Sequence, residues 1–150
     1  MLGGCPSSIR TQLVSTTPPP VWNLTFAHGT IQRSEASFRH ASYTVSDARG
    51  IIWQIDRDAA RPECDPHIEA GWEAVYPDRI TYGLTPACYV ETLAPAPLLE
   101  SGVYHFESRD PVYRNLNGVS FYFRIRSGVV ERASERDFAR QAAAAPELTE

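Results

Sequence analysis

The sequence predicts an all-β protein, an antiparallel β-sandwich of the immunoglobulin-like kind with a short C-terminal helix or tail. Apolar and polar residues alternate in short runs from Val21 onward. Turn signals separate these runs at intervals of roughly ten residues, and no helical pattern lies between them. Prolines interrupt the chain too often for the long, regular hairpins of a lipocalin-type barrel.

Each predicted strand places its large apolar residues on one face. In the first strand Trp22, Leu24 and Phe26 alternate with polar residues, so one face is expected to be buried. The second strand changes parity between Phe38 and Ala41, which predicts a bulge or twist. The predicted strands span residues 21–27, 37–45, 51–56, 72–76, 79–82, 87–92, 102–108, 119–126 and 129–132.

The two ends of the chain differ from this pattern. Residues 6–20 are rich in Ser, Thr and Pro, which favours an extended linker over an arm packed on the domain. Ser134 and Asp137 form a capping-box pattern for a helix over residues 135–145, and a frayed tail is the alternative. We therefore expect three parts: a tether over residues 1–20, a sandwich over 21–133 and a helix or tail over 134–150.

The composition narrows the classes of function. The 150 residues carry 14 basic and 18 acidic side chains, a net charge of -4 that argues against nucleic-acid binding. Every basic residue is Arg, which excludes a Schiff-base or P-loop lysine. We expect no cofactor. A Ser-His-Asp arrangement is recognised in space and not in sequence, and nothing marks a serine as a nucleophile, so we expect no enzyme.

The three cysteines bear on the compartment. Cys64 and Cys88 flank a stretch of strands and turns, and Cys64 lies in a polar loop where an unpaired thiol is unusual. This favours a Cys64–Cys88 disulfide and an oxidising compartment. The alternative is a pair of buried thiols in a cytosolic protein.

Cys5 has a distinctive context. Leu2-Gly3-Gly4-Cys5 resembles the lipobox of bacterial lipoproteins, in which small residues precede an invariant cysteine. The resemblance implies that Cys5 carries a lipid and that the domain is held at the membrane by it. Two further stretches, Ile80-Thr81-Tyr82-Gly83 and Pro97-Leu98 to Tyr104, look like a segment of small uncharacterised bacterial lipoproteins. That group implies a compartment but no activity.

One polar cluster is a candidate metal site. Asp65, His67 and Glu69 offer one nitrogen and two carboxylates at spacings of two residues, which places them on one side of an extended segment. The spacing matches no established metal signature, and a solvated acidic loop beside the disulfide is the simpler interpretation.

Tyrosine and arginine side chains form a candidate contact surface. Tyr122, Arg124 and Arg126 fall on one face of the strand over residues 119–126. Exposed Tyr and Arg are typical of surfaces that bind proteins or glycans. The alternative is that the C-terminal helix covers this face.

These observations predict an exported, lipid-anchored bacterial domain with a binding or structural role in the cell envelope, in the periplasm or anchored at the outer membrane. Its expected partners are the membrane, through a lipid on Cys5, and a protein or glycan. The alternatives are a small metal-dependent hydrolase that uses the loop of residues 65–69 and a cytosolic all-β binding domain.

Overall fold

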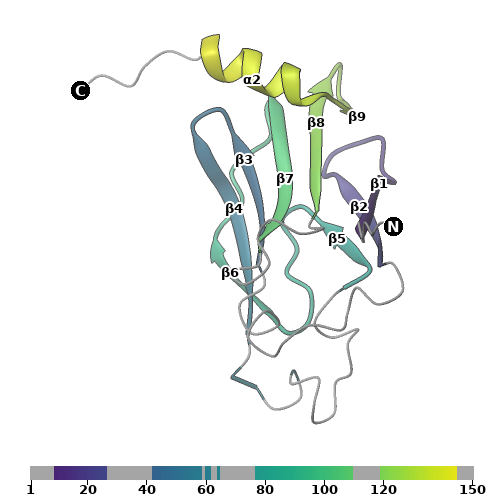
Figure 1. Ribbon diagram of the computed structural model, residues 1–150, viewed down its shortest axis with the longest axis vertical. Coiled ribbons are helices and arrows are strands. Elements are labelled where there is room, and N and C mark those ends of the chain that lie inside the picture. Colours follow the sequence, from purple (N-terminus) through teal and green to yellow (C-terminus); the bar gives the residue numbers. More distant parts are fainter. Residues whose placement is uncertain are drawn as a thin grey trace, which may run out of the picture.

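The residues that the structure describes form a two-layer antiparallel β-sandwich, with a helix that lies across one end of the larger sheet (Figure 1). The computed structural model describes residues 9–26, 42–58, 60–61, 64, 77–109 and 119–144. The elements in chain order are β1 (Ile9–Leu13), β2 (Val21–Phe26), β3 (Ser42–Asp47), β4 (Gly50–Arg57), β5 (Arg79–Thr81), β6 (Tyr89–Leu93), β7 (Val103–Arg109), β8 (Ser120–Arg126), β9 (Val129–Arg132) and α2 (Glu135–Ala144).

The strands divide unequally between two sheets. The smaller sheet has the order β1-β2-β5, and the larger has the order β6-β4-β3-β7-β8-β9. Every pairing between the described strands is antiparallel. The predicted antiparallel sandwich is confirmed, and so is its short C-terminal helix.

Aromatic side chains join the two layers. Trp22 on β2 is fully buried, and its ring stacks on Phe106 of β7 with centroids 3.9 Å apart. The edge of the same indole meets Phe123 of β8 at 5.4 Å. A second contact between the sheets pairs Trp53 of β4 with Tyr82, which follows β5, at 5.2 Å. Such ring pairs hold the two sheets together beyond the area that they bury.

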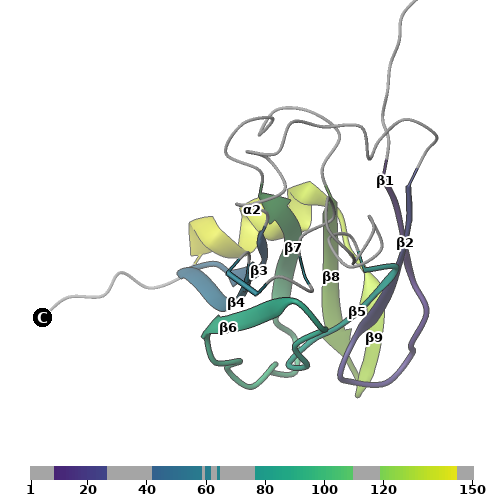
Figure 2. The same ribbon diagram turned by 90° about the horizontal axis from the view of Figure 1, so that it is seen from below.

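Helix α2 lies on the face of the larger sheet that points away from the core (Figure 2). Its capping box forms as predicted: the Ser134 hydroxyl accepts the Asp137 backbone N–H at 3.0 Å, and the Asp137 carboxylate accepts the Ser134 N–H at 3.1 Å. On the sheet side, Gln141 accepts the Val103 backbone N–H and donates to the Ser101 carbonyl. These bonds and the ring of Phe138 fix the helix to the sheet.

Most predicted strands lie within a few residues of the observed ones. The register shift of β3 falls between Val45 and Ser46, whereas the bulge predicted near Phe38 and Ala41 lies outside the described residues. The predicted strand over 72–76 also lies outside them.

The predicted linker needs correction. Part of the predicted linker is a strand, because β1 pairs with β2 along its whole length and Leu13 packs against the core. Tyr82 and Tyr89 are both part of the core, at 7% and 3% exposed. Tyr82 donates a hydrogen bond to the Ala96 carbonyl, which explains how its hydroxyl is buried without penalty.

Candidate functional site

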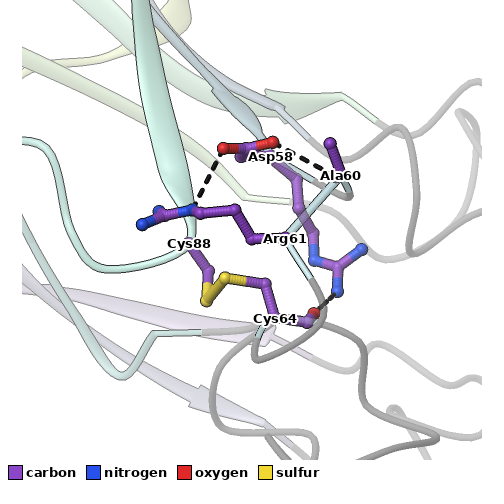
Figure 3. The surroundings of a disulfide bond; sticks show 6 residues. Asp58, Ala60, Arg61, Cys64 and Cys88 are labelled. Atoms are coloured by element: carbon purple, nitrogen blue, oxygen red, sulfur yellow. Dashed lines mark hydrogen bonds and ion pairs between the residues drawn. A yellow bond between two sulfur atoms is a disulfide. The ribbon is translucent and has the colours of Figure 1, made fainter.

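The predicted disulfide is present. Cys64 and Cys88 are bonded, with their Cα atoms 5.4 Å apart, and both side chains are buried. The bond ties the loop after β4 to the start of β6. Beside it, Asp58 accepts hydrogen bonds from the Ala60 backbone and from Arg61 (Figure 3). The Asp58 N–H donates to the Cys88 carbonyl at 2.8 Å. Hydrogen bonds therefore join the same two segments that the disulfide links.

Two other predicted sites cannot be placed. The candidate lipidation residue Cys5 and the candidate metal ligands Asp65, His67 and Glu69 lie outside the described residues. Among the residues that the structure does describe, no group of three or more His, Cys, Asp or Glu side chains is arranged to hold a metal ion. Within the same residues, no helix is long and apolar enough to cross a membrane.

The predicted contact surface lies on the outer face of β8, next to α2. Tyr122 is half-buried beneath Phe138 of the helix, with ring centroids 5.6 Å apart. Arg124 forms ion pairs with Glu131 of β9 at 3.0 Å and with Asp137 of α2 at 3.7 Å. Tyr122, Arg124 and Arg126 form a stripe along β8, and helix α2 contacts its first two residues.

Arg126 continues the stripe beyond the helix. Its guanidinium pairs with Glu131 at 3.1 Å, and its side chain is 59% exposed. Of the three predicted residues, it is the one most open to solvent.

The pairing of β7 with β8 builds a cluster beside this stripe that the sequence did not indicate. His105 lies opposite Tyr122, and Glu107 lies opposite Ser120, so all four side chains share the outer face. His105 Nε2 is 2.8 Å from Ser120 Oγ, and His105 Nδ1 is 3.6 Å from Glu107 Oε1. One imidazole thus contacts a hydroxyl through one nitrogen and a carboxylate through the other.

Two aromatic rings contact the imidazole. Its ring stacks on Tyr122 with centroids 4.1 Å apart and planes 5° from parallel, and Phe138 lies 5.9 Å away. Burial lowers the pKa of His105 below its ordinary value, and the carboxylates of Glu107 and Glu135 oppose that shift. The neutral ring is therefore favoured near neutral pH, with one nitrogen free to accept a proton.

An open cavity of about 540 Å³ adjoins the cluster. Ser120 and Tyr122 form its floor on β8, and Arg132, Glu135 and Asp137 are among the residues of its walls. Ser120 is exposed, so its hydroxyl can be reached from the cavity. A space of this size holds a small ligand.

The sequence contained only a partial signal for the cluster. Alternation placed His105 on the face opposite to Tyr104 and Phe106, and it placed Ser120 on the face of Tyr122. What alternation does not give is which strands are neighbours and in which register, and both are needed to bring His105 to Ser120.

Comparison with protein-family models, with curated proteins and with solved structures finds no match for this chain. Functional inference therefore depends on the geometry itself.

Proposed function

We propose that this protein is an exported, lipid-anchored β-sandwich domain that binds a partner in the bacterial cell envelope. The observation that carries the proposal is the Cys64–Cys88 disulfide. Structural disulfides persist in oxidising compartments and are rare in the reducing cytosol. The lipobox-like Leu2-Gly3-Gly4-Cys5 supports the choice of a membrane-anchored lipoprotein among exported proteins.

The binding role is supported by the outer face of the larger sheet. The cavity beside Ser120 is concave, and Tyr122 and Arg132 contribute to its lining. Aromatic and arginine side chains at a concave surface are typical of sites that bind proteins or glycans. The Tyr122–Arg126 stripe extends this surface along β8.

Metabolic labelling tests the anchor. Cells of the native bacterium that express the protein are fed an alkyne fatty acid, and the protein is isolated and coupled to a fluorophore. We expect label on the wild type in the membrane fraction, and neither label nor membrane retention for Cys5→Ser. Equal labelling of Cys5→Ser, or wild-type protein found in the cytosol, would contradict the proposal.

Cosedimentation with purified cell-wall glycan tests the binding role. We expect the wild-type protein to pellet with the glycan and Arg132→Ala to pellet less, because Arg132 lines the cavity. Arg49→Ala is the matched control, since Arg49 is an exposed turn residue far from the β8–α2 cavity in sequence and not among its lining residues. If both variants match the wild type, the cavity is not a glycan site.

A further inference from the structure

The Ser120–His105–Glu107 cluster has the connectivity of a nucleophile, a base and a carboxylate that positions the base. Ser120 Oγ and His105 Nε2 lie at hydrogen-bond distance, 2.8 Å. Glu107 Oε1 lies 3.6 Å from the other ring nitrogen. Arrangements of this kind are recognised by geometry and by the role of each group, whatever the fold or the order in the chain.

The carboxylate determines which nitrogen carries the proton. A negative oxygen beside Nδ1 favours the tautomer with the proton on Nδ1, which leaves the Nε2 lone pair directed at the Ser120 hydroxyl. Glu107 is itself held by Arg109, whose Nε lies 3.4 Å from Glu107 Oε2. The stacking of Tyr122 fixes the plane of the ring. The base is therefore oriented before any ligand binds.

The nucleophile is also accessible. Ser120 is exposed and forms part of the cavity of about 540 Å³. Arg132 is also among the lining residues of this cavity, and its guanidinium carbon lies 5.2 Å from the centre of the Phe121 ring.

We propose that Ser120 is a nucleophile that transfers acyl groups from small esters to water, with His105 as its general base and Glu107 as a positioning residue. This activity shares the cavity beside Ser120 with the partner proposed above, and its test differs: release of p-nitrophenolate by the purified chain reports the ester chemistry, and cosedimentation reports the partner. Failure of one proposal leaves the other standing.

The chemistry balances with an ester and water as the reactants. Ser120 Oγ attacks the ester carbonyl carbon while its proton passes to His105 Nε2. The tetrahedral intermediate collapses, the bond to the alcohol oxygen breaks, and the proton on Nε2 goes to the departing alcohol. Water, deprotonated by the same nitrogen, then attacks the acyl-serine and releases the carboxylic acid and the free Ser120 hydroxyl.

The test uses p-nitrophenyl acetate and the purified full chain. We expect a burst of p-nitrophenolate that approaches one per protein molecule, and one acetyl group on the peptide that contains Ser120. Ser120→Ala should abolish both. Ser46→Ala is the matched control, since Ser46 lies opposite His105 on the neighbouring strand β3 and should leave the burst unchanged.

The two other groups have distinct expected effects. His105→Gln should slow acylation by about 10²- to 10⁴-fold. Glu107→Gln should slow it less and move the acidic limb of the kcat/KM profile to lower pH, because Glu107 raises the pKa of His105. A purely structural role for Glu107 would not move that limb. An undiminished burst in Ser120→Ala, no burst in the wild type, or acetylation of Tyr122 instead of Ser120 would overturn the proposal.

Discussion

Trp22 packs the smaller sheet against the larger one. It is fully buried, and its ring contacts Phe106 and Phe123 of the opposite sheet. Its indole Nε1 is buried without a hydrogen-bond partner among the described residues. The contribution of Trp22 to stability is therefore its apolar contact, and the unpaired N–H reduces that contribution.

Substitution of Trp22 separates these two effects. Trp22→Ala should lower the free energy of unfolding by about 3–5 kcal/mol, because it leaves a large cavity between the sheets. Trp22→Phe should cost clearly less, because it keeps a ring against Phe106 and removes the unpaired N–H. Urea unfolding followed by circular dichroism measures both. Equal losses for the two variants would contradict this account of the core.

His105 predicts a pH dependence of stability. Burial lowers its pKa in the folded protein, so the unfolded chain binds a proton more readily than the folded one. The stabilisation is fully present above the unfolded pKa of about 6.5 and is lost as the pH falls below it. The groups that face the ring are Ser120 and Tyr122 of β8, Glu107 of β7, and Glu135 and Phe138 of α2.

Urea midpoints at pH 7.5 and pH 5.5 measure this effect. The wild type should lose stability at the lower pH, and His105→Phe should lose less, because it keeps a ring beneath α2 but cannot be protonated. A drop of the same size in both proteins would assign the pH dependence to other groups.

At the scale of elements, α2 is stabilised by its cap and by its contact with the sheet. Its first turn is closed by the Ser134–Asp137 capping box, and its middle packs through Phe138 on His105 and Tyr122. The Ser134 bonds lower the pKa of Asp137, and the cations of Arg124 and Arg140 add to the shift. An isolated helix of this length is marginal in water, so this docking is what orders it.

Substitution of Ser134 tests how much the capping box contributes to α2, compared with docking on the sheet. Ser134→Ala should lower the free energy of unfolding by about 1 kcal/mol and reduce the helical signal in circular dichroism. Ser134→Asp should retain most of both, since a carboxylate can accept the same N–H. If the alanine variant matches the wild type, docking on the sheet alone determines the helix.

The strands differ in how well the sequence predicts them. Alternation located β2, β4 and β8 because each carries large apolar residues on strict parity. It missed β1, since Ile9–Leu13 has few apolar residues and lies next to a proline-rich stretch of linker-like composition. That strand forms because β2 offers an unpaired edge, which is a tertiary cause.

Tertiary pairing also explains why the sequence predicted only part of the candidate site. The sequence identified Tyr122, Arg124 and Arg126 because they lie on one strand. His105 and Ser120 lie on different strands and meet only through the β7–β8 register. Local periodicity carries no information about such pairs, so the cluster became visible only in the folded chain.

At the scale of the whole molecule, the disulfide is the main covalent constraint among the described residues. Cys64 and Cys88 are separated by 24 positions, and closing a loop of this size in the unfolded chain contributes about 3 kcal/mol in the chain-entropy model. The double variant Cys64→Ser, Cys88→Ser should lose about that amount in urea unfolding. Cys5→Ser is the control and should unfold like the wild type. Unchanged stability of the double variant would contradict this estimate.

The most direct test of the account is the oxidation state of these cysteines in the protein's own cells. Protein is alkylated during lysis, digested without reductant and mapped by mass spectrometry. The account predicts a peptide in which Cys64 is linked to Cys88, with neither residue alkylated. Full alkylation of both cysteines would place the protein in a reducing compartment and contradict its export.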